Sequence, residues 1–225
     1  LVSQIIAAKI TYACVQGGTG TGILLLIFGL LFGLILGAIN GTVYAFTRIP
    51  PIITSLGMAL VYEGLAYVIG EGKDLTIEVT GDEITAIQEN WWISLIVILV
   101  VLAVIYIIFD KTKFGYDYKA LRDGQQVALT MGIKEVPNAI ICYVISGGVI
   151  GIAGWLNISY AQMLQQSLNF ASIGTIFIAF LPMFIGGFTG RFSNDKFGYV
   201  LAGISWSFVT ALFDTFQVDY TISSV

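Results

Sequence analysis

Apolar runs of about 20 residues, with one charge or none in each, divide this chain of 225 residues. A helix rises 1.5 Å per residue, so a run of about 20 residues crosses the roughly 30 Å hydrocarbon core of a bilayer. Of all residues, 57% are hydrophobic and 11% are charged, whereas a soluble domain has about 25% charged residues. The runs therefore predict an all-α, polytopic bundle of transmembrane helices, with about six full spans, at residues 23–46, 52–69, 91–109, 138–160, 170–188 and 199–218.

The remaining residues at the two ends fit the same kind of domain. Residues 2–15 are mostly apolar but too few for a span, so we expect them to form the end of a further, partial helix. The sequence starts at Leu1 without a methionine, and the polar residues 220–225 follow the last predicted span. We expect residues 1–225 to form one transmembrane domain that is truncated at both ends.

The charged residues predict the orientation of this domain. Cytoplasmic loops are enriched in Lys and Arg, and half of the ten basic residues lie in the loop of residues 110–136. The loop of residues 71–90 has six acidic residues and a single basic one, Lys73. We therefore expect residues 110–136 inside and residues 71–90 outside, in a multi-pass protein of the cell (cytoplasmic) membrane.

Two stripes of glycine predict where the spans pack. One stripe repeats every four residues, close to one helical turn, at Gly29, Gly33, Gly37 and Gly41. The other stripe thins one side of the span 138–160, at Gly147, Gly151 and Gly154. Small residues let helix backbones approach closely in a membrane. The first stripe would face a second copy of the protein or, as we favour, another helix of the same chain.

The loop of residues 110–136 contains a predicted helix over residues 121–131. Its apolar and small residues, Leu121, Ala128, Leu129 and Gly132, have spacings that favour one apolar face. Such a helix would lie on the membrane surface or dock on a partner protein. The alternative is a solvated connector between two spans.

Three ordered segments carry a family resemblance. They read from Asn40-Gly41 through Thr47-Arg48-Ile49-Pro50-Pro51 to Glu63-Gly64-Leu65-Ala66, then Phe114-Gly115 with Ala120, Ala128, Gly132 and Ile133, then Tyr143-Val144-Ile145-Ser146-Gly147 with Gly151 and Ala153-Gly154. Their order and spacing, over roughly residues 40–197, resemble the permease subunits of bacterial ABC importers. The most similar group carries monosaccharides, nucleosides and branched-chain amino acids, and within it the sugar permeases match best.

The resemblance implies a permease that moves a small polar solute, a monosaccharide first and a nucleoside next, from a binding protein into the cytoplasm. It also implies three kinds of partner: ATP-binding cassette subunits that bind the ATP, a second permease copy, and an extracytoplasmic solute-binding protein. The acidic outer loop is either a docking site for that binding protein or a solvated surface. The residues expected to couple the permease to the ATPase are Leu121, Arg122, Gln126, Ala128, Leu129 and Gly132. Where the family often has Glu-Ala-Ala, this chain has Gln126-Val127-Ala128.

Four polar residues are candidates for the solute path: Asn40, Glu63, Asn157 and Gln162. An ionisable residue at membrane depth is costly unless it faces protein or water. Glu63 is therefore either a functional group or a group near the outer interface. Asn157 and Gln162 lie towards the outer end of a span, where amides bind a polyhydroxylated solute or, alternatively, backbone and water. Pro182 is expected to break or kink the fifth span, and broken spans often line transport routes.

Other classes of protein conflict with the residues present. The sequence has no histidine and two cysteines, so it offers neither a Cys/His metal site nor a Ser/His/Asp triad. The glycines of residues 17–22 are not followed by the Gly-Lys-Ser/Thr of a phosphate-binding loop. We therefore expect a non-catalytic subunit without a cofactor of its own. A non-transporting membrane scaffold and a secondary transporter are the alternatives.

Overall fold

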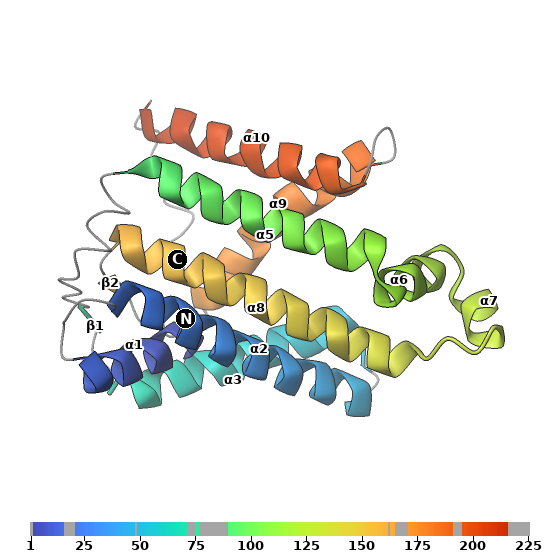
Figure 1. The fold of residues 1–225 in the computed structure, drawn as a ribbon, viewed down its shortest axis with the longest axis horizontal. Helices are drawn as coiled ribbons and strands as arrows, with labels where there is room; N and C mark the ends of the chain where they lie inside the picture. The colour runs from blue at the N-terminus through green and yellow to red at the C-terminus, as the bar shows by residue number, and fades with distance from the viewer. Residues whose placement is uncertain are drawn as a thin grey trace. The chain divides into compact units, whose positions relative to one another are not determined.

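The computed structural model is almost entirely helical (Figure 1). It describes residues 2–15, 21–47, 49–71, 75–76, 90–161, 163–164, 171–190 and 195–215. The chain forms two compact units, Leu1–Gln166 and Ser167–Val225. Within the described ranges, the strands are two residues each, β1 (Leu75–Thr76) antiparallel to β2 (Met163–Leu164). The predicted all-α, polytopic class is confirmed.

The first unit contains the helices that correspond to the first four predicted spans. Its described helices are α1 (Val2–Val15), α2 (Thr21–Thr47), α3 (Pro51–Ile69), α5 (Trp91–Lys111), α6 (Lys113–Asp123), α7 (Gln125–Thr130) and α8 (Glu135–Ala161). By length and composition, α2, α3, α5 and α8 can each cross a membrane. α3 begins with Pro51 directly after Pro50, because proline has no amide hydrogen to lose at the first turn of a helix.

α2 and α8 run antiparallel and contact each other along both glycine stripes (Figure 1). A Cβ atom added at Gly151 would lie 2.5 Å from the carbonyl oxygen of Gly29. A Cβ atom added at Gly41 would lie 3.0 Å from the Cβ of Tyr143. The prediction that the first stripe packs on a helix of the same chain is therefore confirmed.

α1 and α3 pack against this helix pair. On α1, the side-chain nitrogen of Gln4 donates a hydrogen bond to the carbonyl oxygen of Gly151 on α8 at 2.5 Å. On α3, the hydroxyl of Tyr62 donates to the carbonyl oxygen of Leu36 on α2 at 2.8 Å. The buried apolar side chains between these helices are Val2, Ile5, Ala8, Leu25, Ala66, Trp155 and Ile158. Residues 2–15 thus form a helix, as expected, and that helix is part of the core.

The second unit is a pair of helices, α9 (Ala171–Gly190) and α10 (Asp195–Thr215), at the positions of the fifth and sixth predicted spans. They approach closely at Gly186, where a Cβ atom would lie 3.0 Å from the Cα of Tyr199. Pro182 lies inside α9. It removes one intrahelical hydrogen bond, but the helix continues on both sides. Of the two predicted outcomes at Pro182, a break is not observed, and a kink within the continuous helix stays a prediction.

Candidate functional site

Thr112 separates α5 from α6 at the start of the loop of residues 110–136. Its backbone is extended, with φ −106° and ψ 158°, so the helical path stops there. The hydroxyl of Thr112 donates a hydrogen bond to the carbonyl oxygen of Ile108 at 2.5 Å and accepts one from the amide of Gly115 at 3.4 Å. A single side chain thus binds the last turn of α5 and the first turn of α6.

Aromatic rings and an ion pair fill the corner between α5 and α6. The ring of Phe109 meets those of Phe114 and Tyr118 edge to face, with centroids 5.5 Å and 5.2 Å away. The ammonium of Lys119 donates a hydrogen bond to the carboxylate of Asp110 at 2.5 Å. This bond is made to the charged form of the lysine and therefore raises the pKa of Lys119 above its ordinary value.

A break at Gly124 divides the helix that was predicted over residues 121–131. α6 ends at Asp123 and α7 begins at Gln125, with Gly124 between them in an extended conformation, φ −168°. Glycine stabilises a helix less than any other residue except proline, and no strong apolar face holds the two segments in line. The prediction of one continuous helix is therefore wrong. Leu121 and Arg122 lie on α6, whereas Gln126, Ala128 and Leu129 lie on α7.

Gly132 ends α7 in a tight turn. Its φ of +84° lies in the left-handed region, which favours glycine. The amide of Gly132 donates to the carbonyl oxygen of Leu129 at 3.0 Å, and the amide of Ile133 donates to that of Ala128 at 3.1 Å. These two bonds define a Schellman motif, the usual glycine-dependent end of a helix. Gly132 therefore has a structural role, whether or not it also contacts a partner.

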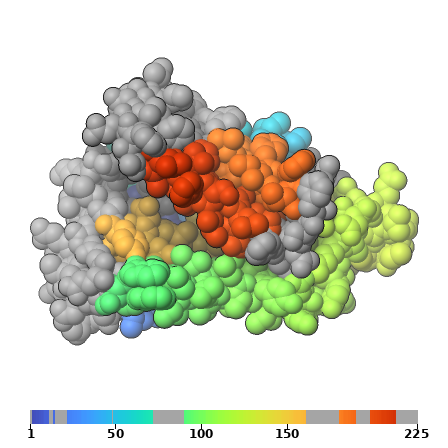
Figure 2. Space-filling model, turned by 90° about the horizontal axis from the view of Figure 1, so that it is seen from above, coloured from blue at the N-terminus to red at the C-terminus, as the bar shows by residue number. Residues whose placement is uncertain are grey.

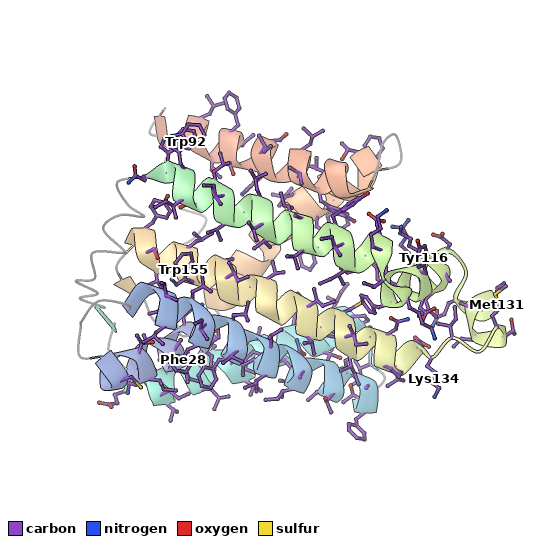
Figure 3. All side chains as sticks on the ribbon, viewed as in Figure 1. Phe28, Trp92, Tyr116, Met131, Lys134 and Trp155 are labelled. Atoms are coloured by element: carbon purple, nitrogen blue, oxygen red, sulfur yellow. The ribbon has the colours of Figure 1, made fainter. Side chains whose placement is uncertain are left out.

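Three apolar side chains at α7, Val127, Leu129 and Met131, are exposed and form what we call the α7 knob. The exposed fraction is 44% for Leu129 and 75% for Met131. Figure 3 shows Met131 at the tip of the loop, away from the helix bundle of the first unit. In Figure 2 the same part of the loop projects beyond α5. The loop thus presents an apolar surface at its most accessible point.

The predicted coupling residues are distributed differently from the single apolar face that their spacing suggested. Ala128 is buried, with 2% exposed, while its neighbour Leu129 is part of the α7 knob. Leu121 is half-buried, and Arg122 and Gln126 are exposed. Val127 and Met131 were missed, because at helical spacing neither lies on the face that Leu121, Ala128 and Leu129 would share.

The candidate residues of the solute path lie on separate helices of the first unit. Glu63 on α3 is buried, with 9% exposed, and its Oε2 atom has no hydrogen-bond partner in the described part of the chain. The same holds for the side-chain oxygen of Asn40 on α2. Asn157 on α8 is exposed, and Gln162 lies outside the described residues. Gln4 on α1 also has a buried side-chain oxygen without a partner among the described residues. Its signal in the sequence was a polar residue in an apolar run.

These features together define a class of protein: a multi-pass helical membrane protein with a projecting apolar loop. The family model for the permease component of the branched-chain amino acid transport system matches residues 1–222. The chain belongs to this family of ABC importer permeases, as the sequence motifs predicted. Its place is accordingly the cell membrane, which several helices of sufficient length and apolar composition can cross.

Curated relatives include permease proteins for sugars and for autoinducer 2. The chain is 34% identical over 208 residues to the L-arabinose transport system permease protein of Escherichia coli (strain K12), covering 91% of this chain and 62% of the relative. It is 28% identical over 153 residues to the autoinducer 2 import system permease protein of Photorhabdus luminescens, covering 66% of this chain and 44% of the relative. It is 24% identical over 195 residues to the fructose import permease protein of Rhizobium meliloti, covering 80% and 54%.

The chain therefore covers between 44% and 62% of the length of these three curated relatives. The similarity is closest to the sugar permeases, as predicted. No solved structure matches the chain.

Proposed function

We propose that this chain is the membrane-spanning part of an ATP-driven importer that moves a monosaccharide from an external binding protein into the cytoplasm. The family supports the transport role. The names of two relatives, permeases for arabinose and fructose, support a monosaccharide as the solute. The chain would work with two ATP-binding cassette subunits, a second permease copy and the binding protein.

The observation that carries this proposal is the α7 knob. Exposed apolar side chains on a projecting loop are costly in water, and large apolar patches of this kind mark interaction sites. The basic residues of the same loop favour the cytoplasmic side of the membrane, where the ATPase subunits would be. A short helix that inserts apolar side chains into a groove is a common mode of recognition. We therefore assign the knob, Val127, Leu129 and Met131, to contact with the ATPase.

Coupling then depends on movement of this contact. ATP binding would bring the two ATPase subunits together, and each subunit would carry the α7 seated in it. A ligand shifts an equilibrium between two conformations only through its different affinity for them. Here the conformations would be inward-facing and outward-facing arrangements of the membrane helices, and α7 would be the point at which ATP favours one of them.

The experiment compares two matched substitutions in the complete complex. Leu129 and Val136 are both apolar and both 44% exposed, but only Leu129 belongs to the α7 knob. The permease is expressed with its ATPase and binding-protein subunits, and co-purification of the ATPase and solute uptake into proteoliposomes are measured. Leu129→Asp places a carboxylate in an apolar contact and should lower both by about tenfold or more, equivalent to at least about 1.4 kcal/mol.

Val136→Asp should leave ATPase binding and uptake close to the unmodified level. It lies in the first turn of α8, where a negative charge is favourable. Unchanged ATPase binding by Leu129→Asp would contradict the assignment of the knob. Uptake by the permease alone, without ATPase subunits, would contradict the proposed mechanism as a whole.

The solute is tested on the binding protein. Thermal unfolding of the cognate binding protein is measured with pentoses, hexoses and nucleosides. A ligand that binds the folded state raises its stability with concentration. Stabilisation by a monosaccharide is the expected result, and stabilisation by nucleosides alone would replace the monosaccharide with a nucleoside in the proposal.

A further inference from the structure

We infer that α5 and α6 form a rigid elbow, which transmits movement of the α7 knob to the membrane helix α5. The elbow consists of Phe109, Asp110, Gly115, Tyr118 and Lys119, which act as positioning residues. This inference rests on the proposed function, because it requires a partner that moves α7. The loop is joined to the membrane helices at two places, through α6 to α5 and directly from α7 to α8. The inference is that the connection through α6 to α5 carries the force.

The closest contact in the elbow is between backbones. Gly115 is buried in the first turn of α6. A Cβ atom at this position would overlap the carbonyl group of Phe109 in the last turns of α5, and the Cα of Phe109 would be 2.7 Å away. Real Cβ atoms do not approach backbone atoms so closely, so α6 can lie against α5 only with glycine here. A contact between two backbones leaves no flexible side chain to absorb movement.

Two side chains of α6 that follow Gly115 also contact the end of α5. The ring of Tyr118, one turn after Gly115, meets the ring of Phe109 edge to face at 5.2 Å. Such aromatic pairs contribute about 0.5–1.5 kcal/mol beyond the area they bury. Lys119 forms its ion pair with Asp110 across nine positions of sequence, from the end of α5 to the second turn of α6. The angle between the two helices is thus held by three contacts, two of them with Phe109 and one with Asp110.

The connections of α7 are weaker. Between α6 and α7 there is one residue, Gly124, and no side chain caps α7 at its start. Between α7 and α8, the side-chain bond is from Gln125 to Glu135 at 2.8 Å, and it is exposed to water. Exposed polar pairs contribute little to stability. α7 can therefore reorient in its partner at Gly124, while α6 and α5 move as one body.

Two matched pairs of substitutions test the elbow. Gly115→Ala is compared with Gly57→Ala on α3, because a Cβ atom at Gly57 would meet nothing within 4 Å. Tyr118→Ala is compared with Tyr116→Ala, because Tyr116 is exposed on the same helix. The complete complex is reconstituted, and three quantities are measured: ATPase subunits bound, ATP hydrolysis, and solute moved per ATP hydrolysed.

Gly115→Ala and Tyr118→Ala should retain the ATPase subunits but lower the solute moved per ATP by about tenfold or more. Gly57→Ala and Tyr116→Ala should keep that ratio within about twofold of the unmodified complex. A merely structural role of the elbow would lower bound ATPase and transport together and leave the ratio unchanged. A normal ratio in Gly115→Ala or Tyr118→Ala would overturn the inference.

An exchange of charges covers the case in which Gly115→Ala does not fold. Asp110→Lys and Lys119→Asp should each lower the ratio of solute to ATP, and the two together should restore it at least in part, because the ion pair is rebuilt in reverse. No restoration, or no loss in the single variants, would count against the elbow. If the failure lies instead in the proposed function, Leu129→Asp will keep its ATPase, which separates the two outcomes.

Discussion

Gly33 on α2 and Gly147 on α8 face each other so closely that a Cβ atom added to Gly33 would lie 2.5 Å from the carbonyl oxygen of Gly147. A Cβ atom added to Gly147 would likewise meet the carbonyl oxygen of Gly33 and, at 2.9 Å, the Cα of Gly37. A side chain at either glycine would push the two helices apart, so the contact between α2 and α8 requires glycine at both positions. Close approach of this kind replaces, inside a bilayer, the hydrophobic force that lipid cannot supply.

We predict that Gly147→Ala destabilises the permease by about 1–3 kcal/mol, the usual cost of overpacking. The matched control is Gly57→Ala on α3, where a Cβ atom would meet nothing within 4 Å. Alanine favours a helix over glycine by up to about 1 kcal/mol, so the control should be neutral or stabilised. Thermal unfolding in detergent measures both. Equal melting temperatures for the two variants would contradict the close packing of α2 on α8.

The packing of α2 on another helix of the chain was predictable from the sequence, because small residues at one-turn spacing mark helix contacts in a membrane. A period of four in Gly29, Gly33, Gly37 and Gly41 places these residues on one side of a helix, and in lipid such a side favours close packing on another helix. The ends of the spans were predictable from charges and from Pro50 and Pro51. These signals are local and strong, because a bilayer restricts the chain to helices.

The candidate site was less predictable, since it lies in the loop, where water satisfies the backbone and several structures compete. The break at Gly124 follows from the low helix propensity of glycine, but glycines also lie inside the continuous helices α2 and α8, so a glycine alone does not indicate a break. Gly115 was recognised as part of a motif, but its contact with Phe109 is between segments joined by a turn at Thr112. Lys119 reaches Asp110 only because the chain turns at Thr112. The direction of that turn could not be predicted from the sequence, and neither could the ion pair.

The ion pair between Lys119 and Asp110 predicts a dependence of stability on pH. The bond raises the pKa of Lys119 in the folded state above its ordinary value of 10.5. The folded state then binds the proton more tightly than the unfolded state. The contribution of Lys119 is therefore fully present below about pH 10 and is lost as the pH rises through the folded pKa.

The measurement is the melting temperature of the permease and of Lys119→Met between about pH 8 and 11.5, a range that covers the ordinary lysine pKa. The variant should melt at a lower temperature at pH 8, and the difference should shrink at the alkaline end. Lys113→Met, at an exposed position of the same helix, should melt like the unmodified protein throughout. A constant difference across the range would mean that Lys119 stabilises through packing and not through its charge.

The orientation of the bundle is tested by accessibility of single cysteines. Cys14 and Cys142 are first replaced by serine, and Asn90→Cys or Lys134→Cys is then introduced. Asn90 precedes α5 and Lys134 precedes α8, and both are exposed. Because basic loops stay in the cytoplasm, a membrane-impermeant maleimide should label Asn90→Cys in intact spheroplasts and Lys134→Cys in inverted vesicles. The reverse pattern would place the α7 knob outside, away from any ATPase.

Glu63 is the strongest candidate for a contact with the solute, because its buried Oε2 atom has no hydrogen-bond partner among the described residues. A hydroxyl of a passing sugar would supply the missing donor. Glu63→Gln can place an amide NH2 group where the Oε2 acceptor was, and a buried hydrogen-bonding group left unpaired costs about 1–3 kcal/mol, so the variant should lower the maximal uptake rate by about fivefold to a hundredfold when loaded binding protein is saturating.

Thr54→Val is the control for Glu63→Gln, because Thr54 is on the same helix and equally buried, but its hydroxyl already donates to the carbonyl oxygen of Pro50 at 3.4 Å. Uptake by Thr54→Val should be close to normal. If Glu63→Gln also transports normally, the carboxyl is a group of the outer interface and lies outside the solute path. If both variants lose uptake together with thermal stability, Glu63 acts on the packing of α3, because a role confined to transport leaves the folded state unchanged.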